Sequence, residues 1–304
     1  QSSGIASQII ADDHYLQSAV SKIATNAFTI SDGEGSSLGF GLYPAAAVIN
    51  HSCGPNLVQT FQYGGTEKKP PALLLTTCRS VADRDELCIA YTDVTAPAQR
   101  RRETLLKGYR FICTCSRCEN AADKDDDDYN ITSDTKQKRR DEAFAIVERT
   151  LAREKSASTS MASATCASLS SPTLKELQEA YRSLKQCCAM ESYYVQEAGE
   201  ALVQVLLDRV GEAESEGQQR ELCSKALSVL EELEKEKNGR CAEYCPLPSL
   251  IRRYKIAKLQ LFLVHDPRPA MMMLQDVHSE LSMYFPRDHQ LIRDLENCMR
   301  VGMG

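Results

Sequence analysis

The spacing of apolar and polar residues divides the chain into a helical start, a strand-rich stretch and a long helical remainder. Apolar side chains over residues 5–27 recur mostly three or four positions apart, which predicts one amphipathic helix. From Phe28 onward, short β-prone runs alternate with turn-forming residues. The predicted strands cover residues 58–63, 72–77 and 86–91. Because alternate strand residues share a face, Tyr91 is expected to end the last strand on the same side as Leu87 and Ile89.

Residues 97–109 have a helical pattern and lead into a compact group of cysteines. The acidic segment 119–137 has too little apolar surface to pack, and it is interpreted as an exposed linker. The Ser/Ala/Thr-rich segment 156–172 is interpreted as a flexible insertion. Beyond Pro172, apolar stripes predict helices throughout, packed antiparallel in a bundle or a tetratricopeptide-like array. The stripes cover residues 174–188, 198–205, 226–233, 250–261, 270–281 and 291–298.

The composition narrows the class of protein. A chain of 304 residues has room for two domains. With 36 basic and 42 acidic residues, its net charge of −6 argues against a nucleic-acid binder and is compatible with a basic protein substrate. No run of about 18 apolar residues occurs, so no membrane association is expected. Thirteen cysteines without an apolar leader favour a reducing compartment, the cytoplasm or the nucleus, where clustered thiols more often hold metal than form disulfides.

Cys113, Cys115 and Cys118 form a C-x-C-x-x-C motif. Zinc prefers four tetrahedral ligands, and a short knuckle of this kind can present several thiolates to one ion. The motif contains no histidine, so a fourth ligand must come from elsewhere, and Cys53 is the candidate. Ordinary buried thiols are the alternative. The charged neighbours Arg110, Arg117 and Glu119 argue against it.

The stretch VINHSCGPNL, residues 48–57, allows a second interpretation of Cys53. Cys53 and His51 are two positions apart, as a nucleophile and its base could be, and such a pair must lie within hydrogen-bond reach. In most pairs with this spacing the side chains diverge, so we expect His51 and Cys53 to lie apart. A thiol-dependent hydrolase nevertheless remains a competing function at this point.

Three motifs resemble a known family. NHSCGPN at residues 50–56, ELCIAYTD at 86–93 and RRRETLLKGYRFICTCSRC at 100–118 resemble the second half of a SET domain with its post-SET zinc knuckle. Their order and spacing are most similar to the SET-and-MYND (SMYD) protein lysine methyltransferases. The resemblance is weaker over residues 173–304, where it rests on helical character and on HDPRPAMMMLQDVH.

The resemblance implies an α+β fold with the following parts. A helical segment (1–27) leads into the C-terminal half of a SET domain (28–96), a post-SET zinc knuckle (97–118), a linker with one helix (119–172) and a helical, tetratricopeptide-like domain (173–304). The family's first SET half carries a Gly-x-Gly cofactor loop and a MYND finger. Since the chain begins QSSG without Met, we expect these parts to precede Gln1 in a larger protein.

The resemblance also implies a role for individual residues. Tyr91 would be the catalytic tyrosine, and Phe28 and Tyr109 would line the channel that admits the substrate lysine. S-adenosylmethionine would be bound by Asn26, Asn50, His51 and Phe111. One zinc ion would be bound by Cys53, Cys113, Cys115 and Cys118.

The function implied is a protein-lysine N-methyltransferase that transfers methyl from S-adenosylmethionine to a histone or another protein. A further protein partner could bind the helical domain. The competing class is a catalytically inactive, zinc-stabilised SET-like scaffold that binds proteins through this domain. An upstream Gly-x-Gly loop would favour the enzyme.

Overall fold

The computed structural model of the chain describes residues 13–63, 70–120, 133–157, 172–235, 244–264 and 266–302. Residues 5–12 of the predicted first helix lie outside this range, as do residues 121–132 and 158–171 of the two predicted linker segments. None of the helices in the described part combines the length and apolarity that a bilayer-spanning segment requires.

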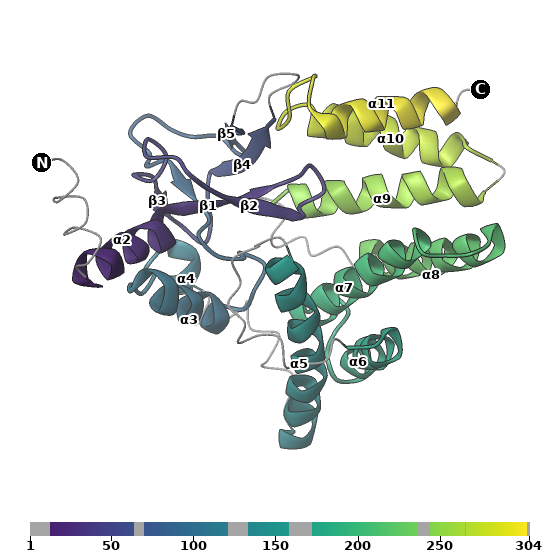
Figure 1. Cartoon of the computed structure of the whole chain (residues 1–304), viewed down its shortest axis with the longest axis horizontal. Helices are drawn as coiled ribbons and strands as arrows, with labels where there is room; N and C mark the ends of the chain where they lie inside the picture. The colour runs from purple at the N-terminus through teal and green to yellow at the C-terminus, as the bar shows by residue number, and fades with distance from the viewer. Residues whose placement is uncertain are drawn as a thin grey trace, which may run out of the picture.

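The strands gather at one end of the molecule, next to helix α2 (Asp13–Asn26). They pair two by two, β1 with β2 and β4 with β5 antiparallel, and β3 with β6 parallel (Figure 1). Their bounds are β1 Ala27–Ser31, β2 Ser37–Leu42, β3 Asn50–His51, β4 Leu57–Gln62, β5 Ala72–Thr77 and β6 Cys88–Ile89. The runs predicted at 58–63 and 72–77 correspond to β4 and β5.

The predicted strand 86–91 is shorter than expected. At both ends of β6, side chains take the backbone hydrogen bonds that a neighbouring strand would otherwise make. Before it, the amide of Asn56 donates to the Glu86 carbonyl (2.9 Å) and accepts from the Cys88 N–H (2.8 Å). After it, the Tyr91 N–H donates to Nδ1 of His51 (3.0 Å). Tyr91 therefore lies beyond the strand, and the prediction that it ends the strand was wrong.

Two helices enclose the cysteine motif: α3 (Ala98–Tyr109) precedes it and the short α4 (Ser116–Asn120) contains its last cysteine. The remaining helices, α5 to α11, follow one another with each packed against the next. Their bounds are α5 Asp134–Ala157, α6 Leu174–Cys187, α7 Tyr193–Val210, α8 Glu216–Lys235, α9 Leu247–Leu263, α10 Arg268–Leu281 and α11 Gln290–Gly302.

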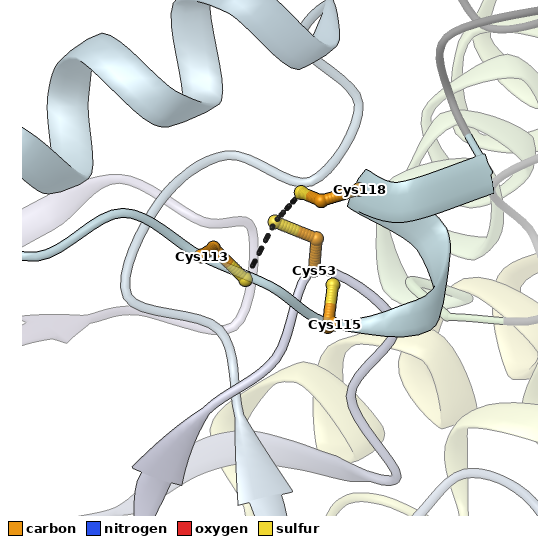
Figure 2. Close-up of side chains that lie close together, drawn as sticks. All are labelled: Cys53, Cys113, Cys115 and Cys118. Atoms are coloured by element: carbon orange, nitrogen blue, oxygen red, sulfur yellow. Dashed lines mark hydrogen bonds between the residues drawn. The ribbon is translucent and has the colours of Figure 1, made fainter.

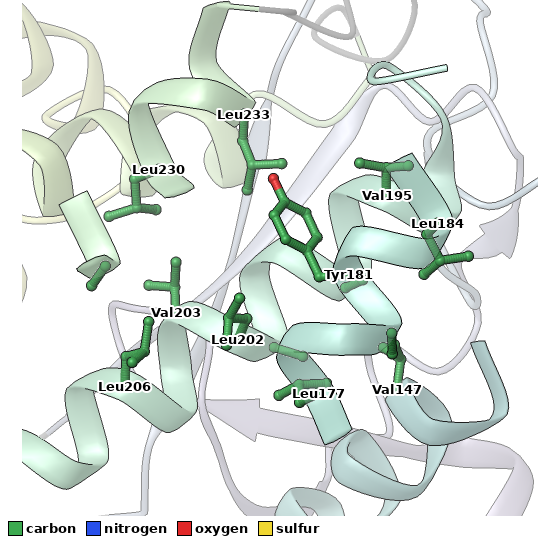
Figure 3. Packing of buried hydrophobic residues seen from close by; sticks show 14 of the residues in the cluster. Val147, Leu177, Tyr181, Leu184, Val195, Leu202, Val203, Leu206, Leu230 and Leu233 are labelled. Carbon is green, nitrogen blue, oxygen red and sulfur yellow. The ribbon is translucent and has the colours of Figure 1, made fainter. Parts of the chain in front are cut away.

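Helices α5 to α8 share one hydrophobic core (Figure 3). The predicted stripes supply it: Leu177, Leu184 and Leu230 are fully or almost fully buried. Helix α6 begins at a capping box, in which Thr173 and Glu176 satisfy each other's backbone N–H groups. Helix α5 joins this core through Ala143, Phe144 and Val147, so the helix predicted within the linker segment packs with the helical domain.

Helices α9 to α11 form a second core that includes Val58 of β4. The hydroxyl of Thr60, on the same strand, donates to the carbonyl of Tyr284 in the turn after α10 (3.0 Å). The strand-rich part is thus packed directly on the last helices. The predicted α+β fold class is confirmed.

Candidate functional site

Four cysteines from two distant segments converge on one point. Cys53 follows β3, Cys113 and Cys115 lie between α3 and α4, and Cys118 lies in α4 (Figure 2). Their sulfur atoms all lie within 4.8 Å of one another. Cys53 Sγ is 3.4 Å from Cys118 Sγ and 4.0 Å from Cys113 Sγ. A tetrahedral zinc ion with Zn–S bonds of about 2.3 Å separates its sulfurs by about 3.8 Å, so this cluster can hold a metal ion.

Most of the cluster is buried, and its environment favours the thiolate form of Cys118. Cys53 and Cys118 are fully buried. The hydrogen bond between Cys53 and Cys118 lowers the pKa of Cys118, and the neighbouring Arg101 lowers it further. The same hydrogen bond, together with burial, raises the pKa of Cys53. Metal binding requires deprotonated thiols, and a buried cysteine with a lowered pKa is suited to that role.

His51 lies close to Cys53, with Nε2 at 3.3 Å from Sγ, so the expectation that the two side chains diverge was wrong. Nδ1 of His51 accepts the Tyr91 N–H, which leaves the ring proton of the neutral imidazole on Nε2. Nε2 therefore donates to the sulfur and cannot take a proton from it. Burial also lowers the pKa of His51 to about 4. This arrangement disfavours a Cys–His nucleophile.

An aromatic cavity adjoins the cysteine cluster. The ring of Tyr91 lies 4.7 Å from that of Tyr109 and 5.4 Å from that of His51, measured between centroids. The Tyr91 hydroxyl donates to the Ile49 carbonyl (2.5 Å). Beside these rings is a cavity of about 180 Å³. Its lining contains the predicted residues Asn26, Phe28, Tyr91 and Tyr109.

The other predicted cofactor residues lie apart from this cavity. Among the described residues, its lining does not include Asn50, His51 or Phe111. Phe111 packs against His51 on the side of the cysteine cluster, with ring centroids 6.0 Å apart. Asn50 is exposed, and its amide donates to Glu86 Oε1 (2.6 Å). The predicted site residues thus form two adjoining groups, with Asn50 on a neighbouring edge.

Several residues near the cluster were not predicted. Arg117 donates from Nη1 to the Cys53 carbonyl (2.8 Å) and to the Val94 carbonyl (2.7 Å). The guanidinium of Arg117 also lies 5.5 Å from the ring centroid of Tyr244, in the segment before α9. Arg101 is fully buried on the face of α3 toward the cysteines. Only its position four residues before the apolar Leu105 could have indicated this.

A larger cavity of about 480 Å³ lies between the β1–β2 turn, β4, α7 and α9. Acidic residues outnumber basic ones in its lining, and Arg252 is already paired with Glu200 (2.7 Å). The acidic lining residues are Asp32, Glu34, Asp93, Glu197, Glu200 and Glu234, against the basic Arg252 and Lys255.

Comparison with known proteins gives one consistent group of relatives. The chain is 38% identical over 112 residues to the mouse "Histone-lysine N-methyltransferase SMYD3", a match that spans 37% of this chain and 24% of that protein. It is 35% identical over 107 residues to "N-lysine methyltransferase SMYD2-A" of Danio rerio, spanning 35% and 23%. The chain is a relative of the SMYD proteins. This confirms the resemblance seen in the three motifs.

A plant SMYD relative shows the same pattern. "Histone-lysine N-methyltransferase ASHR1" of Arabidopsis thaliana is 32% identical over 100 residues, or 33% of this chain and 19% of that protein. No family model matches the chain. Each match covers about a quarter or less of the relative's own length.

Proposed function

We propose that this chain contributes to a protein-lysine N-methyltransferase that uses S-adenosylmethionine. The observation that carries the proposal is the close packing of a four-cysteine cluster with the cavity of Tyr91 and Tyr109, in a relative of proteins named as lysine methyltransferases. We further propose that it acts in the cytoplasm or the nucleus, on histone or non-histone lysines, with a protein partner on its helical domain.

When bound, S-adenosylmethionine supplies an electrophilic methyl group attached to a positive sulfonium. We propose that Asn26, Asn50, His51 and Phe111 hold it. Asn26 lines the same cavity as Tyr91, and Phe111 packs on His51, which supports these assignments.

The attacking lysine must lose its proton, although its ordinary pKa is near 10.4. Burial in a channel lined by Phe28 and Tyr109 disfavours the charged ammonium, because desolvation penalises the ion. Tyr91, at the same cavity, would hold the neutral amine in line with the methyl group. Alignment of this kind supplies a large part of the acceleration of a displacement reaction.

The metal would be zinc, bound by all four cysteines. Four thiolates leave no open coordination position, as in structural rather than catalytic zinc sites. The ion would fasten the segment 113–118 to the turn after β3 and so hold Phe111 and Tyr109 against His51 and Tyr91. A basic segment of a substrate protein would suit the acidic cavity between β4, α7 and α9.

A methyl-transfer assay with radiolabelled S-adenosylmethionine and a panel of histone and non-histone proteins tests the proposal. It should be run on the protein including any sequence that precedes Gln1. We expect transfer to lysine, and a loss of about a hundredfold or more in Tyr91→Phe with cofactor binding retained. Tyr63→Phe is the matched control, because the Tyr63 hydroxyl also donates to a backbone carbonyl (Ser31, 2.5 Å) but lies outside the cavity.

Unchanged turnover in Tyr91→Phe would rule Tyr91 out as the catalytic residue. Absence of transfer to every protein in the panel, with the cofactor unbound, would instead favour the inactive scaffold.

A further inference from the structure

Arg101 is the bulkiest of the fully buried side chains in the described part of the chain, with 0% of its surface exposed. Its Nη1 donates to the Ala96 carbonyl (2.6 Å). The other two nitrogens, Nε and Nη2, are buried and have no hydrogen-bond partner among the described residues. Guanidinium stays charged in proteins, and a buried charge is costly unless it is paired. The fold must therefore offer Arg101 an anionic partner.

The cysteine cluster is where that partner lies. Arg101 and Leu105 are one turn apart on the same face of α3, and Leu105 packs in one cluster with Cys53, Cys113 and Cys118. The acidic groups that act on the guanidinium are the thiols of Cys53 and Cys118. No carboxylate forms a salt bridge with Arg101 within the described residues.

We infer that Arg101 is the counter-ion of the metal-bound thiolates and donates from Nε and Nη2 to the sulfurs of Cys53 and Cys118. This inference rests on the proposed zinc site. Binding a divalent cation to four thiols releases four protons and leaves a group of net charge −2 in a buried place. One guanidinium cancels half of that charge, and hydrogen bonds from Arg101 stabilise the thiolates that the ion needs. Arg101 is thus a positioning residue for the metal centre.

Two other arginines contact the same cysteines, but they donate hydrogen bonds to backbone carbonyls and not to sulfur. Arg102 donates from Nη2 to the Cys118 carbonyl (2.7 Å), and Arg117 donates to the Cys53 carbonyl (2.8 Å). Arg102 is exposed, whereas Arg101 and Leu105 are buried. Replacing Arg102 removes the same formal charge from the same helix without touching the sulfurs, so Arg102→Gln is a matched control for Arg101→Gln.

The first measurement is the rate at which zinc passes from the purified protein to a chromogenic chelator. Partners that contact metal ligands typically change metal affinity by about 10- to 100-fold. We expect Arg101→Gln to release zinc about tenfold faster or more, and Arg102→Gln to stay within about threefold of wild type. Arg101→Lys keeps the charge but loses the planar pair of donors, so it should fall between them.

The second measurement separates a bond to sulfur from a general loss of stability. In protein loaded with Co²⁺, the sulfur-to-metal charge-transfer band should move to lower energy in Arg101→Gln, because the thiolate electrons lose a stabilising donor. The band should not move in Arg102→Gln. If Arg101→Gln does not fold, the zinc-release rate and the Co²⁺ band of Arg101→Lys test the inference instead.

The possible failures are distinguishable. Wild-type protein that purifies without metal and takes up none would overturn both the zinc site and the role of Arg101. Wild type with one zinc ion, together with wild-type release rates and an unmoved band in Arg101→Gln and Arg101→Lys, would overturn the role of Arg101 alone.

Discussion

His51 receives the backbone N–H of Tyr91 at Nδ1, and this one hydrogen bond limits the chemistry open to Cys53. The imidazole proton is left on Nε2, 3.3 Å from the sulfur, where it can stabilise a thiolate but cannot accept a proton. The same bond fixes the backbone of Tyr91 next to the cavity. His51 therefore connects the cysteine cluster with the cavity through its two ring nitrogens.

His289 is a second buried histidine, with 3% of its surface exposed, in the turn before α11. Its Nδ1 accepts the Leu291 N–H (3.1 Å), and burial lowers its pKa below the ordinary histidine value. The nearby carboxylates of Asp288, Asp32 and Asp294 oppose this shift but are outweighed by burial. Between the lowered pKa and about 6.5, the unfolded chain binds more protons than the folded one.

Stability should therefore fall as the pH drops from about 7 toward the lowered pKa of His289. We expect wild type to lose more unfolding free energy than His289→Gln between about pH 7.5 and pH 5.5. Urea unfolding at the two pH values measures this difference. An equal loss in both proteins would show that His289 titrates normally in the folded state.

Helix α3 connects the cysteine cluster with the C-terminal helices by presenting a different face to each. Arg101 and Leu105 face the cysteines, whereas Arg100 reaches α5 and α7. The guanidinium of Arg100 lies 4.9 Å from the ring centroid of Phe144 and 5.8 Å from that of Tyr193, and it forms an ion pair with Glu148. A cation among aromatic rings next to a carboxylate stabilises this contact between helices.

Replacing Arg100 should loosen that contact. We expect Arg100→Met to lower the free energy of unfolding by about 1–2 kcal/mol, since the cation–π contacts and the ion pair are lost. Lys107→Met, at an exposed position of the same helix, should change it by less than about 0.5 kcal/mol. Chemical denaturation measures both, and equal effects would contradict a specific role for Arg100.

Local patterns predicted the elements well where one segment determines its own structure. The helix predicted at 97–109 is Ala98–Tyr109, the strand at 72–77 has the predicted bounds, and the helical stripes supply the cores. The errors lie where side chains from elsewhere intervene. Asn56 and His51 take the backbone partners that a longer β6 would need.

The candidate site was likewise predictable where a local motif defines it, and not where it depends on distant residues. The cysteine spacing indicated a metal site and made Cys53 the candidate fourth ligand, and the structure brings Cys53 into the cluster. The burial of Arg101 was not predicted, because in a run of three arginines only its position four residues before the apolar Leu105 indicates that it faces inward. The contact between His51 and Cys53 depends on the Tyr91 backbone, 40 residues away from His51.

The molecule as a whole is assembled from contacts between segments far apart in sequence. Thr60 of β4 donates a hydrogen bond to the turn after α10, 224 residues later in the chain. The thiol of Cys53 contacts that of Cys113, which is 60 residues away in sequence. The first contact attaches the strand-rich part to the last helices. The second, once a metal ion is bound, would fasten the turn after β3 to the segment that carries Tyr109 and Phe111. The proposed methyl-transfer site depends on that fastening.

The metal content of wild type and of Cys53→Ser tests this arrangement most directly. Elemental analysis of the purified proteins should find one zinc ion per wild-type chain and almost none in Cys53→Ser, although the C-x-C-x-x-C motif is intact in both. Cys223→Ser, at a buried cysteine of α8 outside the cluster, should keep its zinc. A wild-type chain without metal, or a Cys53→Ser variant that retains a full zinc ion, would contradict a metal centre shared by the two segments.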